Sequence, residues 1–348
     1  MFKKENYIID YRLSLREALI IMNELDDDLT IFVVNEYLKL IGTLTDGDAR
    51  RGLIKNLDID SAVEKFMNKS FIAIEENKFT INDILNSKRN KIKILPIVNE
   101  SGCIINLINF SFFYSYLPLD SIIMAGGEGL RLRPLTEKTP KPLLCIGNKP
   151  IMEHLIDRLV RFGINKIQIS VNYLGNQIVD YFKDGLAKNI SIEYIYENKK
   201  MGTIGSLSLA NEIKNENILL LNSDILSNIN FEDFFVDFIT KDADISIACI
   251  PYEVNIPYAI MDTHNDRIIG LKEKPTLNYI SNAGIYLIKK KHLKLIPENS
   301  YFNATDLVDQ MLEANLNVTY YMIHDYWLDI GKMDDYNKAQ KDIRHLKI

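Results

Sequence analysis

The chain has 348 residues, 47% of them hydrophobic and 25% charged, with a formal net charge of −6 at pH 7. These values are typical of globular proteins, and the length predicts two domains, each with its own core. The acidic balance argues against broad nucleic-acid binding. The chain start lacks the apolar core of a signal peptide, no apolar run approaches the ~18 residues of a membrane span, and three cysteines lie far apart. We therefore expect a cytoplasmic protein that binds neither membrane nor nucleic acid.

The first 117 residues contain an internal repeat. Ser14 and Glu17 form a capping box, which predicts a helix over about 15–24. Strands are predicted over 29–34 and 39–44, and a second helix begins at Thr45. A shift of 64 residues aligns 31–36 with 95–100, and Thr80 then caps a helix as Ser14 does in the first copy. We predict a tandem of two strand–helix–strand–strand–helix units, with the domain boundary at Tyr116-Leu117-Pro118.

The sequence GTLTDGDARRG, at 42–52, resembles a CBS domain, so residues 1–117 are identified as a CBS pair with an α+β fold. In that family a Thr-x-x-Asp motif holds the ribose of an adenine nucleotide. The resemblance implies that Thr45 and Asp48 do so here, with Arg50 or its neighbour near the phosphates. A hydroxyl and a carboxylate suit sugar hydroxyls, and a guanidinium suits phosphate.

The second copy departs from this pattern, because Asn109 and Phe112 stand where the first copy has Thr45 and Asp48. We therefore expect at most one nucleotide site. A Thr-x-x-Asp turn is also an ordinary helix start. The alternative, which stays open, is that these two residues only cap a helix and that the pair serves dimerisation.

From residue 118 to 348, strand and helix signals alternate. Strands are predicted over 122–125, 166–171, 190–196, 218–221 and 244–250, and helices over 150–162, 175–183, 203–213, 231–240 and 333–346. Such alternation predicts a Rossmann-like α/β domain with a mostly parallel sheet and helices on both faces. Ligands of these sheets bind beyond the carboxyl ends of the strands. We therefore expect the loops after Ala125, Val171 and Leu221 to share one face.

The first of these strands runs into Gly126-Gly127-Glu128-Gly129, followed by Arg131 and, after a proline-stiffened run, Lys141. Glycines let the backbone approach a ligand closely, and backbone N–H groups together with fixed cations suit a polyphosphate. A Walker loop would need Gly-Lys-Ser/Thr, and a dinucleotide fingerprint would need a glycine at Leu132. A glycine-rich turn with solvated basic residues is the alternative on these residues alone.

The sequence GGEGLRLRPLT followed by KPLL resembles the signature loop of the sugar-1-phosphate nucleotidyltransferases, and five motifs follow the family's order over residues 119 to about 340. The resemblance implies the nucleotide-diphospho-sugar transferase fold and the reaction of a sugar 1-phosphate with an NTP to give an NDP-sugar and pyrophosphate. It implies that Arg131, Lys141 and Asp224 are catalytic. It also implies that the loop residues Gly126, Gly127, Glu128 and Gly129 bind the nucleotide.

Two aspartates are candidates for Mg²⁺. Asp224 directly follows an apolar strand, a position that suits a hard cation bound to phosphate, although aspartate is also common at ordinary turns. In the resembling family this aspartate binds Mg²⁺, and the aspartate of a W-x-D-x-G segment, here Asp329, completes the site. The family's G-T-A-G-A-L segment, which lies against base and ribose, matches Gly202, Thr203 and Gly205. Without the other motifs, the same glycines would fit a helix start.

The resemblance also implies a sugar-phosphate site. Leu271–Pro275, LKEKP, matches an E-K-P element whose glutamate binds sugar hydroxyls and whose lysine contacts the phosphate, here Glu273 and Lys274. A strand that lines the sugar pocket in the family matches Asn282 and Gly284. Asn172, which follows strand 166–171, is a weaker candidate. A lone charged run such as LKEKP is otherwise typical of solvated surface.

A CBS pair before this catalytic domain is similar to a bacterial guanylyltransferase arrangement that includes the glucosamine-1-phosphate guanylyltransferase of legionaminic acid synthesis for flagellin glycosylation. The resemblance implies GTP, glucosamine 1-phosphate, Mg²⁺ and a homo-oligomer. Mannose-1-phosphate guanylyltransferase, or an enzyme that uses UTP, CTP or dTTP, is the alternative. A glycosyltransferase would commonly have Asp-x-Asp, whereas Ile225 and Leu226 follow Asp224. A nucleotide-sensing regulatory protein with an inactive transferase domain is the alternative from a different class.

Overall fold

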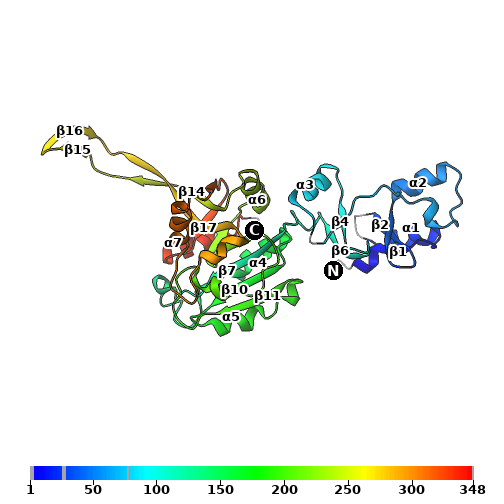
Figure 1. The fold of residues 1–348 in the computed structure, drawn as a ribbon, viewed down its shortest axis with the longest axis horizontal. Helices are drawn as coiled ribbons and strands as arrows, with labels where there is room; N and C mark the ends of the chain where they lie inside the picture. Colours follow the sequence, from blue (N-terminus) through cyan, green and yellow to red (C-terminus); the bar gives the residue numbers. More distant parts are fainter. Residues whose placement is uncertain (1–3, 26–28, 77, 347–348) are drawn as a thin grey trace. The chain divides into compact units, whose positions relative to one another are not determined.

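The structure, a computed structural model, describes residues 4–25, 29–76 and 78–346 and contains two compact units, residues 1–118 and 119–348 (Figure 1). Each unit is described by itself. Of the helices in these described parts, none is both long enough and apolar enough to cross a membrane.

The N-terminal unit contains the repeat that the sequence predicts. Its first copy consists of β1 (Ile8–Asp10), α1 (Leu15–Asn23), β2 (Thr30–Val34), β3 (Leu40–Thr45) and α2 (Asp46–Ile54). The second consists of β4 (Ile74–Glu75), α3 (Ile81–Arg89), β5 (Ile94–Val98) and β6 (Ile104–Asn109). Each copy builds a three-stranded sheet, in the orders β1-β2-β3 and β4-β5-β6. Capping boxes start α1 at Ser14, α2 at Thr45 and α3 at Thr80.

The second copy lacks the final helix that we predicted, so that part of the prediction is wrong. In the first copy, Thr45 and Asp48 exchange the capping-box hydrogen bonds that start α2. At the equivalent position the side chain of Asn109 accepts a hydrogen bond from the Ser111 N–H at 2.8 Å. This local turn replaces the cap, and the chain continues without a helix to Pro118.

The C-terminal unit is built on a seven-stranded sheet in the order β11-β10-β7-β12-β17-β14-β18. These strands are β11 (Ser191–Tyr196), β10 (Lys166–Val171), β7 (Leu119–Ala125), β12 (Asn217–Asn222), β17 (Thr276–Lys289), β14 (Ile245–Asn255) and β18 (Val318–Met322). All neighbouring pairs are parallel except the two that β17 makes. The predicted mostly parallel α/β sheet is confirmed.

Helices cover this sheet, whose central strand β7 has every residue buried. The helices are α4 (Ile151–Arg161), α5 (Gly175–Phe182), α6 (Phe231–Thr240), α7 (Ala304–Glu313) and α8 (Met333–Asp342). Ile122 and Met124 pack in one cluster with Leu307 and other residues of α7. Since successive strand residues point to opposite faces and Ile123 is also fully buried, both faces of β7 are covered. The Phe162 and Phe231 rings, 5.3 Å apart, join α4 to α6.

The helix predicted over 203–213 is wrong, because only a 3₁₀ turn forms, from Gly205 to Leu209. The N–H groups of Ile204 and Gly205 both donate to the carbonyl of Phe302, at 3.1 and 3.0 Å, so the segment is tied to a distant part of the chain. Gly202 has a φ of 75°, which helical residues do not adopt. The last helix also ends earlier than predicted, at Asp342 rather than at residue 346.

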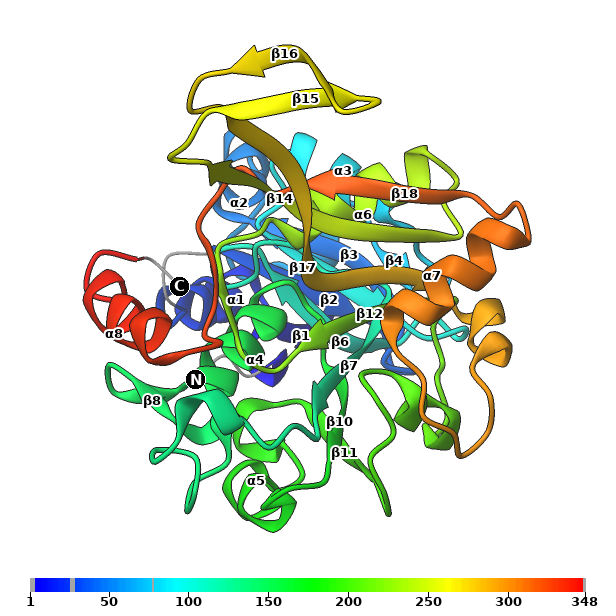
Figure 2. The same ribbon diagram turned by 90° about the vertical axis from the view of Figure 1, so that its left-hand side faces the viewer.

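Beyond the sheet, β14 and β17 continue as a two-stranded ribbon that ends in the hairpin of β15 (Ile260–His264) and β16 (Arg267–Lys272). We call residues 251–281 the arm. Figures 1 and 2 show the arm extending away from the sheet, and not one of its residues is buried. The sheet pairing of β15 and β16 is with each other alone.

Candidate functional site

Four neighbouring strands end at the same level of the sheet. Val171 at the end of β10 pairs with Tyr196 on one side and Ala125 on the other, and Asn222 at the end of β12 pairs with Met124. Because the strands are parallel, their loops leave the sheet at one edge. The prediction that the loops after Ala125, Val171 and Leu221 share one face is therefore confirmed. The residues that follow the strands are Gly126, Asn172, Glu197 and Ser223.

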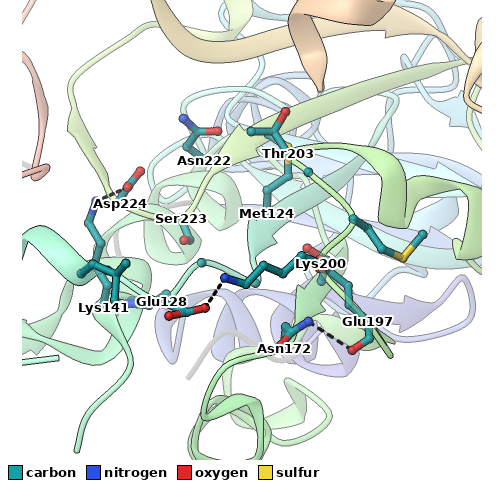
Figure 3. Close-up of a pocket in the computed structure, with 18 of the residues that line it drawn as sticks. Met124, Glu128, Lys141, Asn172, Glu197, Lys200, Thr203, Asn222, Ser223 and Asp224 are labelled. Atoms are coloured by element: carbon teal, nitrogen blue, oxygen red, sulfur yellow. Dashed lines mark hydrogen bonds and ion pairs between the residues drawn. The ribbon is translucent and has the colours of Figure 1, made fainter. Parts of the chain in front are cut away.

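A cavity of about 570 Å³ lies at this edge (Figure 3). The glycine loop lines it over 126–131, together with residues that follow the other three strands. Three cations, Arg131, Lys141 and Lys200, and three carboxylates, Glu128, Glu197 and Asp224, are among the lining residues. The cavity is large enough for a nucleotide, and its lining combines these charged groups with the backbone of the glycine loop.

The glycine loop presents its backbone to the cavity. A Cβ on Gly127 would have no heavy atom within 4 Å, so this position is open toward a ligand. Gly129 has a φ of 61°, and a Cβ there would lie 3.0 Å from Thr136 and 3.1 Å from Lys141. Between them, Glu128 forms an ion pair with Lys200 at 2.6 Å (Figure 3). The hydrogen bond from Lys200 lowers the pKa of Glu128, so this carboxylate is charged at neutral pH.

Lys141 joins the glycine loop to the two predicted metal ligands. Its ammonium forms an ion pair with Asp224 and lies 3.8 Å from Oδ1 of Asp329, and its side chain is only 12% exposed. The two aspartates meet because β13 (Ile225–Ser227) pairs with β19 (Trp327–Asp329), which places Ile225 opposite Asp329. The Ile330 N–H also donates to the carbonyl of Asp224, at 3.1 Å.

The surroundings of Asp329 raise the pKa of its carboxyl group. Burial raises its pKa, the charge of Asp224 raises it further, and the positive charges of Lys141 and Arg131 only partly offset these effects. The Arg131 guanidinium lies nearby, since a Cβ on Gly331 would be 3.6 Å from its Nη2 and 3.3 Å from Oδ2 of Asp329. The site therefore gathers two cations of the glycine loop and two carboxylates, one that follows β12 and one at the end of β19.

The donor set of Asp224 and Asp329 fits a hard divalent cation. Oδ1 of each residue is buried and has no hydrogen-bond partner. A buried carboxylate oxygen without a donor is costly, and Mg²⁺ satisfies such oxygens while keeping water or phosphate as further ligands. In the described parts of the chain, no group of three or more His, Cys, Asp or Glu residues could hold a metal ion. Mg²⁺ would therefore need substrate oxygens beside these two aspartates.

The predicted base-and-ribose segment has two parts. Gly202 and Thr203 line the cavity, whereas Gly205 lies behind them and is buried. A Cβ on Gly205 would clash with the carbonyl oxygen of Ser300, so only glycine permits this close backbone approach. The Thr203 hydroxyl accepts a hydrogen bond from the Ala304 N–H at 2.8 Å, which attaches the segment to the start of α7.

The structure does not bring all predicted sugar residues to the cavity. Asn172 lines it and donates to the carbonyls of Glu197 and Lys199, at 3.2 and 3.3 Å. Gly284, with a φ of 72°, leaves room for the side chain of Asn222, which is a lining residue. The side chain of Asn282 instead bonds within its own strand. Its amide nitrogen donates to the Tyr286 hydroxyl and its amide oxygen accepts from the Gly284 N–H, both at 2.8 Å.

Glu273 and Lys274 lie on the arm. Both are exposed, and neither lines the cavity. Lys274 has a φ of 42°, in the left-handed region, where the chain turns from β16 into β17.

Sequence reasoning missed several lining residues, of which Glu197 is the most informative. It directly follows β11, as Asn172 follows β10, so its position at a strand end was the available signal. Burial raises its pKa above the ordinary glutamate value. A Cβ on Gly126 would lie 2.7 Å from its Oε1, so the glycine allows the carboxylate to approach the loop. Other lining residues that we did not predict are Ser170, Lys200, Asn222, Ser223 and Tyr301.

In the N-terminal unit, the predicted nucleotide residues bond to one another. Asp48 is buried and accepts hydrogen bonds from the Thr45 hydroxyl and from Arg51, both at 2.6 Å. Arg50 forms an ion pair with Asp46 on the helix surface. These contacts agree with the capping alternative, and binding of an adenine nucleotide by Thr45, Asp48 and Arg50 stays a prediction.

Comparison with known proteins places the chain in a family. The nucleotidyl transferase family model matches residues 120–345, and the CBS domain model matches residues 3–55, which is the first copy of the repeat. The chain therefore belongs to the nucleotidyl transferase family and carries an N-terminal CBS domain. The predicted fold class and the predicted enzyme class, a sugar-1-phosphate nucleotidyltransferase, are confirmed at that level.

Three relatives illustrate the match. The chain is 32% identical over 235 residues to D-glycero-alpha-D-manno-heptose 1-phosphate guanylyltransferase of Aneurinibacillus thermoaerophilus, which covers 65% of this chain and 99% of the relative. It is 27% identical over 234 residues to mannose-1-phosphate guanylyltransferase of Mycobacterium tuberculosis, over 65% of this chain and 64% of the relative. The structure of HddC from Yersinia pseudotuberculosis complexed with GMP-PN is 26% identical, with a TM-score of 0.52, over 65% of this chain and 99% of HddC.

Proposed function

We propose that this enzyme transfers GMP from GTP to a sugar 1-phosphate, with Mg²⁺ as cofactor, and releases pyrophosphate. The observation that carries the proposal is the cluster of Lys141, Asp224 and Asp329 at the end of the glycine loop. Two of the relatives described above are named guanylyltransferases of sugar 1-phosphates, and the HddC structure holds GMP-PN. An intact cluster of this kind favours an enzyme over a regulatory protein with an inactive transferase domain.

Nucleotidyl transfer requires the protein to position the two substrates and to neutralise negative charge on their phosphates. The sugar phosphate is already an anionic nucleophile, so the protein needs no general base. It must align this group with the α-phosphorus of the NTP and stabilise negative charge as pyrophosphate leaves. Arg131 and Lys141 hold the triphosphate and neutralise the transition state. Asp224 and Asp329 hold Mg²⁺, which supplies electrostatic stabilisation of the phosphate oxygens.

Substitution Lys141→Ala tests this assignment. We expect kcat/KM to fall by roughly 100- to 1,000-fold, which corresponds to about 2.7–4 kcal/mol, because a fixed charge aimed at the reacting phosphate is lost. The measurement is pyrophosphate release by the purified variant, with its melting temperature as a check on folding. Lys138→Ala, an exposed lysine of the same loop, is the matched control and should keep wild-type turnover. Unaltered turnover in Lys141→Ala would refute the role.

We propose that Glu197 selects the base. Guanine presents two adjacent N–H donors on its Watson–Crick edge, and a carboxylate accepts both in a charge-assisted, bidentate pair. Uracil and thymine present a single donor between two acceptors, which suits a glutamine amide better. Glu197 lies at the cavity wall between the glycine loop and Asn172, where a base could stack beside the Gly126 backbone.

Substitution Glu197→Gln should therefore lower kcat/KM for GTP by roughly 10- to 100-fold, the discrimination that one bidentate contact with a base provides. It should also raise the activity with UTP relative to that with GTP. Glu193→Gln, on the same strand but outside the cavity, is the control and should leave the GTP preference intact.

The pH dependence of GTP binding gives a second test. Because burial raises the pKa of Glu197, its carboxylate becomes protonated at a higher pH than an ordinary glutamate does. KM for GTP should thus rise as pH falls in the wild type and stay flat in Glu197→Gln. An unchanged base preference in this variant would show that another group reads the base.

For the sugar, we propose glucosamine 1-phosphate, as in legionaminic acid synthesis for flagellin glycosylation, with mannose 1-phosphate as the second candidate. The resemblance of the CBS-plus-transferase arrangement supports the first sugar, and the name of the mycobacterial relative supports the second. Asn172 and Gly284 lie at or beside the cavity. Glu273, Lys274 and Asn282 would reach the sugar phosphate only through a change in the arm or its base.

We propose that residues 1–117 act as a regulatory or dimerising CBS module for the transferase domain at 118–348. The compact N-terminal unit and its repeat support this proposal. Calorimetric titration of the full chain with ATP and AMP should detect one site, and Thr45→Val should weaken it at least tenfold. A truncation that starts at Leu119, with unchanged kinetics, nucleotide response and mass, would rule out both roles.

A further inference from the structure

One aromatic side chain lines the cavity. In the described parts of the chain, Tyr301 is the only lining residue with an aromatic ring, and it is 64% exposed. Two other apolar lining residues, Met124 and Met201, are only 9% and 1% exposed, so they present little surface to a ligand. Leu130 is exposed as well, but it is a branched side chain next to Arg131 in the glycine loop. Tyr301 therefore supplies the flat apolar surface of this cavity.

The backbone on both sides of Tyr301 is fixed. The Phe302 N–H donates to the carbonyl of Met201 at 3.0 Å, and the Phe302 carbonyl accepts from the Gly205 N–H at 3.0 Å. On the other side, the carbonyl of Ser300 approaches Gly205 so closely that a Cβ there would clash with it. The Phe302 side chain is buried in the core. Because a tyrosine has only two side-chain torsions, a ring on such a backbone loses little conformational freedom when a ligand binds.

The same segment contacts Glu197. Burial raises the pKa of Glu197, and a hydrogen bond from the Met201 N–H is among the interactions that partly offset this rise. Met201 thus bonds Glu197 through its N–H and the neighbour of Tyr301 through its carbonyl. Gly202 and Thr203, which follow Met201, line the cavity too. Tyr301 therefore stands on the side of the cavity where we place the base.

We propose that the ring of Tyr301 stacks on the face of the nucleotide base whose edge bonds Glu197. The inference rests on the proposed function in that it needs an NTP in the cavity. A carboxylate reads the hydrogen-bond donors on the edge of one base, whereas an aromatic ring contacts the π-face that every base has. Tyr301 supplies affinity and orientation for any NTP, and Glu197 supplies the selection among NTPs.

The Tyr301 side chain has no structural contact that would explain its ring. Among the residues that the structure describes, no hydrogen bond reaches its hydroxyl, and no second aromatic ring or cation contacts its ring. A tyrosine that supports a core is buried and normally has a partner for its hydroxyl. We therefore expect Tyr301→Ala to keep the wild-type melting temperature, so that a loss of binding in this variant reports the ring itself.

The first test is the Kd for GTP and for UTP, measured by calorimetry with Mg²⁺ and without sugar phosphate. Tyr301→Ala should weaken the binding of both nucleotides by a similar factor, roughly 5- to 150-fold, which is the usual effect of removing one stacked ring. Tyr301→Phe, which keeps the ring, should bind both as the wild type does. Tyr320→Ala is the matched control, because Tyr320 is 53% exposed on β18 and lies outside the cavity.

The outcomes separate this inference from the proposed function. Wild-type affinity for both nucleotides in a folded Tyr301→Ala protein would overturn the stacking and leave guanylyl transfer standing. A rise confined to KM for glucosamine 1-phosphate would show that the ring packs on the sugar and would overturn the inference in the same way. Absence of nucleotide binding by the wild type would overturn both.

A second test observes the stacked ring directly. Tyr301→Trp should keep the wild-type Kd for GTP and add a fluorescent ring to the chain, whose natural tryptophan is Trp327. GTP should quench this added emission, after subtraction of the change that GTP causes in the wild type. GTP binding without any additional quenching would contradict contact between the ring and the base.

Discussion

The site depends on the register of β7 between β10 and β12. Because Ala125, Val171, Tyr196 and Asn222 end their strands at nearly the same level, four loops leave the sheet together. Each loop then brings a different group to the cavity: a glycine-rich backbone, an asparagine that donates hydrogen bonds to the next loop, a half-buried glutamate and an aspartate. A slip of one residue would turn every side chain of a strand to the other face, so the buried apolar core on both faces of β7 fixes the chemistry as well as the fold.

Positive and negative side chains are paired within the cavity. Lys141 is paired with Asp224 and Lys200 with Glu128 (Figure 3), so carboxylates hold two of the three cations that line the cavity. Asp224 and Asp329 would hold a hard cation through the oxygens that lack a hydrogen-bond partner, and that cation would supply further positive charge for phosphate oxygens.

The sequence predicted what local patterns encode. Apolar runs and caps gave the strands and most helices, and the 64-residue repeat gave the N-terminal unit. The helix expected over 203–213 failed because its backbone bonds to Phe302, a contact a hundred residues away that no local pattern reveals. Glu197 was missed although it directly follows β11, because its approach to the Gly126 backbone depends on the pairing of separate strands. The exposed position of Glu273 and Lys274 was not predicted either. These residues lie on the arm, and the arm forms because β14 pairs with β17 and β15 pairs with β16 beyond the edge of the core.

Guanylyl transfer to a sugar 1-phosphate is tested by pyrophosphate release with Mg²⁺ from GTP, UTP, CTP and dTTP, each offered with glucosamine, mannose and glucose 1-phosphates. We expect release with GTP and one sugar, glucosamine 1-phosphate, at least tenfold above every other combination. Preference for another nucleotide, or no release from any combination although GTP binds, would contradict it.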